Sequence, residues 1–432
     1  MRTFPLLGLT LSLIACTNSR PASEAVPGEP SASRRSRLFC RIARGCAGAG
    51  LLGAALMPQA LAQEPVFTDA DQQAGYWTAG RQMSQGAGYW TAGRLMRATP
   101  LDVPAASLMM EELLEAPADD SGSVNDGAYA AEDDAIAPDP KARLHPPLRR
   151  GREELPDITG LDLEQAAADV VAPAHVGSSG AYFSSSRLVP TNARLHYPYS
   201  TVGKLFFVQP GVGRFVCSAV VLRPRIVLTA GHCVHRGSGG NGGFFTNFLF
   251  VPAFHQGQAP FQQWDWRFVV TTGSWANSNG NVPNRADFAI LVVRDRPFGG
   301  SPTRIGQVTG WLGYRTNALL PNHAKLIGYP ANFDGGQIAH QVDAQHAGSA
   351  GQGTVVYGSD MEGGSSGGPW VENFGTPAVG QTGGFRFFPN RVVGVTSYGP
   401  VDTARKYQGS SVLNQEFLNI LNIACNQAPG NC

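Results

Sequence analysis

The sequence lacks several features that would assign it to other protein classes. No stretch reaches the roughly 18 consecutive apolar residues that a membrane-spanning helix requires. The histidines, His340 and His346 among them, form no compact ligand pattern, so neither a metal site nor another cofactor is predicted. Basic residues are scattered without a cluster, which argues against nucleic-acid binding. Heptad repeats are also absent, and nothing argues against a monomer.

The net charge of +1 conceals three regions of different composition. Residues 1–62 carry seven basic and two acidic side chains, residues 63–187 carry nine and twenty, and residues 188–432 carry seventeen and ten. This division predicts an export signal region, an acidic segment with little capacity to form a core, and one folded domain.

Two export-like signals compete at the N-terminus. Residues 6–15 are apolar and precede Cys16 in a sequence that resembles a lipoprotein cleavage box. Residues 34–62 contain an arginine-rich stretch, an apolar stretch and a small-x-small cleavage site, and they form the better signal. Secretion is therefore favoured, with an envelope lipoprotein anchored through Cys16 as the alternative.

The acidic segment 63–187 contains few aliphatic runs and is predicted to be loosely ordered. It contains the heptapeptide GYWTAGR twice, at residues 75–81 and 88–94. Two copies are too few for a solenoid. A tandem duplication in a tolerant segment is favoured over a paired docking motif.

Residues 188–432 consist of short runs rich in Val, Ile, Phe and Tyr, separated by Gly, Pro and Asn. These runs predict strands at residues 202–208, 216–222, 225–229, 288–293, 325–329, 354–357 and 392–397. Helical periodicity is confined to residues 411–423. The prediction is an all-β domain with a short C-terminal helix, and its length fits two six-stranded antiparallel barrels better than one sandwich.

Four cysteines remain once the three in the export region are set aside. An even number in an exported domain indicates two disulfides, most simply Cys217–Cys233 and Cys425–Cys432. Free buried thiols are the alternative.

Three motifs contain residues with catalytic potential. Ser366 lies within residues 363–369 (GGSSGGP), where glycines permit a tight turn that exposes a nucleophile and frees backbone N–H groups. His232 ends the apolar run before Cys233 and could act as a general base. Asp287 begins an apolar strand, where a buried carboxylate needs a partner such as an imidazole. Each motif alone also has a purely structural interpretation.

Together these motifs resemble the chymotrypsin/trypsin superfamily, which has the order His, Asp, Ser and the same sixteen-residue cysteine spacing. The resemblance implies an endopeptidase that acts on protein or peptide substrates by acyl transfer, without a cofactor. It also implies an oxyanion hole at the N–H groups of Gly364 and Ser366. The strand that pairs with substrate would contain Ser397, Tyr398 and Gly399.

Within the superfamily, residues 197–200, 310–314 and 328–330 resemble the bacterial glutamyl-endopeptidase branch. Thr396 and Met361 stand where glutamate-specific members have a histidine and a threonine. Asp360 stands where trypsin-like relatives have the acid that selects Arg or Lys. A basic preference is thus expected, and a preference for glutamate or for small or apolar residues is the alternative. A catalytically silent binding protein is the alternative to an enzyme.

Ser365 occupies the position where trypsin relatives have the acid that captures a newly freed N-terminus. That activation switch is therefore absent. The acidic segment 63–187 is expected to act instead as a removable propeptide that masks the basic domain, with cleavage somewhere between Arg149 and Arg187.

Overall fold

The computed structural model describes residues 66–69, 89–106, 132–138, 181–298, 300–320, 322–351, 353–376, 388–402 and 404–432. All of them belong to one compact unit, Ala60–Cys432. Both predicted export signals, Cys16 and the first copy of the repeat lie outside the described residues. No helix within the described ranges is long and apolar enough to cross a membrane.

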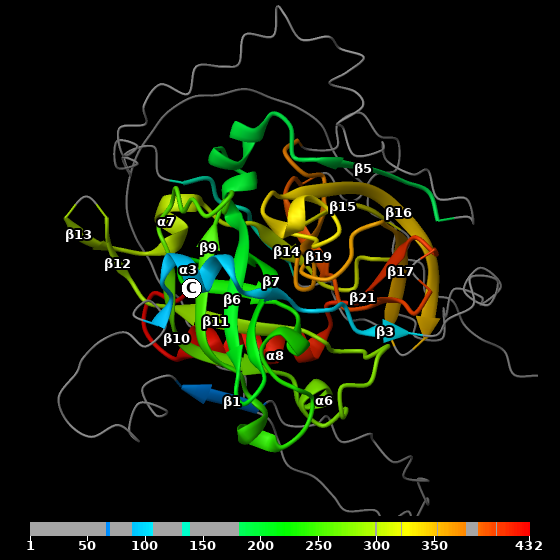
Figure 1. The fold of residues 1–432 in the computed structure, drawn as a ribbon, viewed down its shortest axis with the longest axis horizontal. Helices are drawn as coiled ribbons and strands as arrows, with labels where there is room; N and C mark the ends of the chain where they lie inside the picture. Colours follow the sequence, from blue (N-terminus) through cyan, green and yellow to red (C-terminus); the bar gives the residue numbers. More distant parts are fainter. Residues whose placement is uncertain are drawn as a thin grey trace, which may run out of the picture. The chain divides into compact units, whose positions relative to one another are not determined.

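Six antiparallel strands form a closed barrel around the core of the first half of the domain (Figure 1). The hydrogen-bonded order is β9–β10–β11–β8–β7–β6, and β6 pairs with β9 to close the ring. Valine, isoleucine, leucine and aromatic side chains point inward from these strands and are almost completely buried. The strands are β6 (Val202–Gln209), β7 (Gly213–Val221), β8 (Ile226–Thr229), β9 (Thr246–Pro252), β10 (Trp264–Thr271) and β11 (Ala289–Val293).

The second half of the domain is built on another antiparallel sheet, with the order β21–β17–β16–β15–β18–β19. Its end strands approach each other where the Val395 N–H donates to Ser410 Oγ at 3.0 Å. Because no strand pairing closes this ring, a second closed barrel stays a prediction. The strands are β15 (His323–Gly328), β16 (His340–Gly351), β17 (Thr354–Gly358), β18 (Pro369–Glu372), β19 (Arg391–Val395) and β21 (Tyr407–Ser411), and β14 (Gly313–Arg315) lies parallel to β19.

Five short strands in the described residues come from the segment that was expected to be mostly loosely ordered. Each of them pairs with a strand of one of the two large sheets or with a loop strand. Their order therefore comes from backbone hydrogen bonds to the domain rather than from a core of their own. The pairs are β1 (Val66–Asp69) with β10, β2 (Thr99–Pro100) with β7, β3 (Ala105–Ala106) with β20 (Gly399–Pro400), β4 (Glu132–Asp133) with β14, and β5 (Phe183–Arg187) with β16.

The C-terminal helix α8 (Gln415–Asn426) starts four residues later than predicted, because Ser411 ends strand β21. The Asn414 side chain caps its first turn by accepting from the N–H groups of Glu416 and Phe417. The disulfide Cys425–Cys432, which the sequence predicted, follows this helix. The other helices are single turns or little more: α3 (Ala92–Met96), α6 (Gly273–Ala276) and α7 (Ile305–Thr309).

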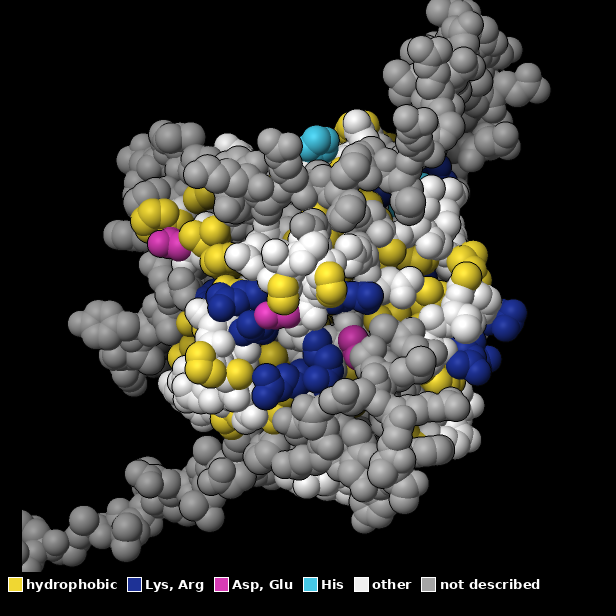
Figure 2. Space-filling model, turned by 90° about the vertical axis from the view of Figure 1, so that its left-hand side faces the viewer, with side chains coloured by type: hydrophobic (Ala, Val, Ile, Leu, Met, Phe, Trp, Pro, Cys, Tyr) yellow, Lys and Arg dark blue, Asp and Glu magenta, His cyan; other side chains and the backbone are white. Residues whose placement is uncertain are grey.

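Basic side chains that are scattered in the sequence gather on the face of the molecule that Figure 2 shows. Acidic side chains lie among them. Arg225 forms a two-point pair with Asp295, at 2.5 and 2.7 Å. The sequence alone could not foresee the gathering of basic side chains on one face.

Candidate active site

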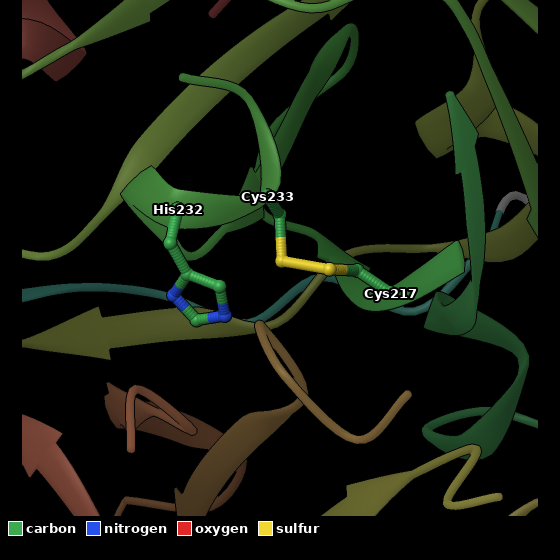
Figure 3. A group of neighbouring side chains, drawn as sticks. All are labelled: Cys217, His232 and Cys233. Atoms are coloured by element: carbon green, nitrogen blue, oxygen red, sulfur yellow. A yellow bond between two sulfur atoms is a disulfide. The ribbon is translucent and has the colours of Figure 1, made fainter. Parts of the chain in front are cut away.

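His232 lies in η5 (Gly231–Cys233), a single helical turn directly after β8. Its neighbour Cys233 forms the predicted disulfide with Cys217 of β7 (Figure 3). The Trp275 ring packs edge-on against the imidazole, with ring centroids 6.0 Å apart. A Cβ at Gly231 would lie 2.7 Å from the Trp275 ring, so the glycine permits this packing. These contacts hold the imidazole in one place.

Asp287 lies two residues before the start of β11 and is completely buried. Its Oδ1 accepts a hydrogen bond from the backbone N–H of His232, and its Oδ2 lies 2.8 Å from His232 Nδ1. The Ser397 hydroxyl donates to the same Oδ2 at 2.6 Å. Since a carboxylate only accepts, the hydrogen-bonding pattern assigns a proton to Nδ1 and leaves Nε2 free to accept one.

Ser366 lies in the glycine-rich loop between β17 and β18. The backbone there is left-handed at Gly364 (φ 92°) and Gly367 (φ 75°), as glycine allows. A Cβ at Gly367 would lie 2.0 Å from Thr229 Oγ1, so this loop presses against the end of β8. The carbonyl of Ser366 also accepts a hydrogen bond from the backbone N–H of Ser218 at 2.7 Å. The loop from the second sheet is thereby fixed against the strand that precedes His232.

Two buried polar atoms of this group are unsatisfied. His232 is 5% exposed and Ser366 is 0% exposed. Neither His232 Nε2 nor Ser366 Oγ has a hydrogen-bond partner among the described residues. Buried polar groups without partners are uncommon in structural positions and are expected where a ligand or a reaction uses them.

Ser365 is tied into a buried network that the sequence motifs did not reveal. Its hydroxyl donates to the Glu362 carbonyl at 2.6 Å and accepts from Gln408 Nε2 at 2.8 Å. The same Gln408 amide donates to the carbonyl of Met361 at 2.8 Å. Gln408 of β21 therefore braces the turn before Ser366, although no sequence motif marks it.

A cavity of about 240 Å³ opens beside the loop. Asp360, Met361 and Gly399 line it, as do Arg405 and Lys406. Asp360 is 5% exposed, and its Oδ1 has no hydrogen-bond partner among the described residues. The cavity thus contains an unpaired buried carboxylate oxygen that a cationic group could satisfy.

The other residues assigned to substrate binding have internal partners. The Thr396 hydroxyl accepts from the Trp370 indole N–H at 3.0 Å, and the Tyr398 hydroxyl bonds to the Thr354 hydroxyl at 3.3 Å. Neither residue lines the cavity. Burial raises the pKa of Tyr398 above its usual value. The hydrogen bond from Ser397 to Asp287 likewise places that side chain behind the imidazole rather than in the cavity.

Two peptide carbonyls from the N-terminal segment contact this site. The Gly364 N–H donates to the Leu101 carbonyl at 2.8 Å, and the Gly399 N–H donates to the Pro104 carbonyl at 2.9 Å. Both donors belong to the groups that the sequence assigned to the oxyanion hole and to substrate pairing. Both therefore already hold a peptide carbonyl.

Among the described residues, Cys217, His232 and Cys233 are close enough together to resemble a metal site. The two sulfur atoms are joined in a disulfide, as Figure 3 shows, and offer no thiolate. The Nδ1 atom of the imidazole contacts Asp287. This group is therefore poorly suited to binding a metal ion.

No family model matches the chain. An extracellular metalloprotease of Bacillus subtilis (strain 168) is 25% identical over 190 residues, which are 43% of this chain. The match covers 55% of that protein, so the chain spans about half the length of the curated relative it matches.

Three solved structures are also similar. The thermostable serine protease AL20 from an extremophilic microorganism matches with a TM-score of 0.45 and 28% identity, over 55% of this chain and 100% of that one. Protease Anisep from Arthrobacter nicotinovorans matches with a TM-score of 0.43 and 28% identity, over 52% of this chain and 94% of that one. A Glu endopeptidase in complex with MPD matches with a TM-score of 0.43 and 18% identity, over 59% of this chain and 100% of that one. These three similar structures are thus described as a serine protease, a protease and a Glu endopeptidase.

Proposed function

We propose that the protein is a secreted serine endopeptidase that uses Ser366 as nucleophile, His232 as general base and Asp287 as the group that orients the base. The observation that carries this proposal is the free Nε2 of an imidazole whose Nδ1 is held by a buried carboxylate, in a site that also contains an unpartnered serine hydroxyl. Hydrogen bonds between catalytic groups often tighten only when substrate binds.

In the proposed reaction, Ser366 Oγ attacks the carbonyl carbon of a peptide bond and passes its proton to His232 Nε2. The N–H groups of Gly364 and Ser366 stabilise the oxyanion that forms. Collapse of the intermediate breaks the C–N bond, and His232 returns the proton to the leaving amine. A water molecule, deprotonated by His232, then hydrolyses the acyl ester.

We further propose a preference for Arg or Lys before the cut. The support is Asp360, which lines the cavity beside the loop and whose buried Oδ1 has no hydrogen-bond partner among the described residues. A guanidinium or ammonium group would complete a charge-assisted pair there. Arg405 and Lys406 also line this cavity, so a glutamate preference is the alternative outcome that the cleavage test must distinguish.

Two disulfides fit an exported protein, because disulfides form and persist in oxidising compartments. The substrates would be proteins or peptides outside the cytoplasm. The chain's own acidic segment is proposed as its propeptide, and the protein is proposed to act as a monomer.

The test is cleavage of a mixed peptide library, analysed by mass spectrometry, by the mature parent protein, from which the acidic segment 63–187 has been removed, and by Ser366→Ala prepared in the same way. We expect cleavage by the parent and a loss of about 10⁵-fold or more in the variant. The residue before each cut identifies the pocket preference. Equal cleavage by both proteins, or reaction of neither parent nor variant with a serine-directed phosphonate, would contradict the proposal and favour a silent binding protein.

A further inference from the structure

Residues 89–106 form a continuous path from the outer face of the first barrel to the candidate active site. The Trp90 ring packs on Phe206, with centroids 5.5 Å apart, and its indole N–H donates to the Asn247 carbonyl at 2.6 Å. Leu95 of α3 is 6% exposed in the same apolar cluster. The second copy of the GYWTAGR repeat thus provides the anchor for this segment.

The path then enters the site itself. Strand β2 pairs with β7, and the Leu101 N–H donates to the Val216 carbonyl at 3.0 Å. The next contacts are those of the Leu101 carbonyl with Gly364 and the Pro104 carbonyl with Gly399. At the far end, Ala106 is 3% exposed in a cluster that contains Tyr398.

A substrate carbonyl would need the same Gly364 N–H that now holds Leu101. A backbone N–H that already donates to one carbonyl at 2.8 Å is not free to stabilise an oxyanion on another. Residues 89–106 and a substrate therefore cannot occupy the site together.

The direction of the segment also differs from that of a substrate. In a substrate, the residue that enters the primary pocket is the one whose carbonyl is attacked. Here the carbonyl that accepts from the Gly364 N–H belongs to Leu101. The cavity is instead lined by Asp102 and Val103, which follow Leu101 in the chain. Strand β3 accordingly runs parallel to β20. A peptide that binds in this direction does not place the peptide bond that follows the bound carbonyl in the orientation that a substrate has.

We propose that residues 89–106 are a tethered inhibitor that binds the active-site cleft in the reverse direction and keeps the uncut chain inactive. This inference rests on the proposed protease function. It assigns inhibition to one short described segment and gives the second repeat copy the role of its anchor.

The test measures how fast the intact chain is labelled at Ser366 by a fluorescent phosphonate, with mass spectrometry confirming that the chain is uncut. Two variants release the segment at opposite ends: Trp90→Ala at the anchor and Ala106→Arg at β3. Each has a matched control at an exposed residue outside the cavity, Met96→Ala and Val212→Arg.

We expect labelling by both release variants to rise about tenfold or more, since a tenfold change in a binding equilibrium needs only about 1.4 kcal/mol. The controls should react like the parent. A synthetic peptide of residues 89–106 should slow the released variants again, whereas a scrambled peptide should not. Equal labelling rates in all five proteins would overturn the inference.

A second measurement separates this inference from the proposed function. Hydrogen exchange in the full chain carrying Ser366→Ala reports the N–H groups of Gly364 and Gly399 without any chemistry. We expect both to be protected and to exchange faster once Trp90→Ala is added. If Trp90→Ala speeds the exchange but no protein that contains Ser366 is labelled by the phosphonate, the docked segment is supported and the proposed protease function is rejected. Unchanged exchange would reject the docked segment.

Discussion

The Asp287 carboxylate accepts hydrogen bonds from three donors: the backbone and the ring of His232, and the hydroxyl of Ser397. The two bonds to His232 fix the orientation of the imidazole. The bond from Ser397 disperses negative charge that would otherwise stabilise the imidazolium. Ser397 is thereby a positioning residue that acts through Asp287.

We predict that Ser397→Ala lowers kcat about tenfold with little change in KM, because the carboxylate loses a single charge-assisted hydrogen bond. Steady-state kinetics measure kcat and KM separately. Ser186→Ala, at an exposed position of β5, is the control. An equal loss of folding stability with unchanged kcat would show that Ser397 is merely structural.

The sequence motifs predicted residues whose chemistry is local, but not the residues that support them from a distance. Ser366, His232 and Asp287 each lie in a short pattern that can be recognised by itself. Gln408 and Trp275 lie in no such pattern, because their roles depend on contacts with residues about 40 positions away in the chain. The role of Ser397 could not be predicted either, since its partner is 110 positions away.

At the scale of the element, strand β6 contains a buried cation. Lys204 is 2% exposed, and its ammonium group donates to the Gly336 carbonyl at 2.7 Å. It lies 4.8 Å from the centroid of the Phe254 ring, and within the described residues no carboxylate pairs with it. Burial lowers the pKa of Lys204 from 10.5 to about 8.

This pKa predicts a pH-dependent stability. The folded state disfavours the charged amine, so the cost is fully present below pH 8 and disappears as the pH rises toward 10.5. We expect Lys204→Met to raise the free energy of unfolding at pH 7 by about 2 kcal/mol, with the gain shrinking toward pH 10. Urea unfolding at both pH values measures this. Lys325→Met, at a surface pair with Asp343, should change little, and a pH-independent gain for Lys204→Met would contradict the prediction.

Strands were predictable where apolar residues run together, as in β6, β7 and β11. Strand β16 was missed because its twelve residues are largely small or polar, with Asp343 and Gln345 exposed. Strand β21 was missed for a different reason. Its sequence YQGSS is polar, yet all five residues are buried, with Ser411 bonded to the backbone of Asp287 and of Asn284. Such polar buried strands give no hydrophobic periodicity from which to predict them.

At the scale of the whole domain, the candidate site lies where the two halves meet. The first barrel provides His232 and Asp287, and the second sheet provides Ser366 and Ser397. The path of residues 89–106 could not be predicted, because its strands are only two residues long and form only against their partners.

Helix α8 connects the two halves, because it follows β21 of the second sheet but packs against β10 and β11 of the first barrel (Figure 1). Phe417 is completely buried at this contact. Its ring meets Phe288 at a centroid distance of 5.9 Å and Tyr314 at 5.2 Å. Since Phe288 directly follows Asp287, this packing supports the strand that carries the proposed orienting acid.

We predict that Phe417→Ala lowers the free energy of unfolding by about 3–5 kcal/mol, as expected for a large cavity in a core. Proteolytic activity should be lost at a lower urea concentration than barrel structure, because the helix holds one half of the proposed active site against the other. Parallel urea titrations, one following peptide cleavage and one following tryptophan fluorescence, measure the separation. Asn422→Ala on the exposed face of α8 is the control. Coincident transitions in Phe417→Ala would show that the two halves unfold as one unit, and that α8 stabilises the domain without holding the site together.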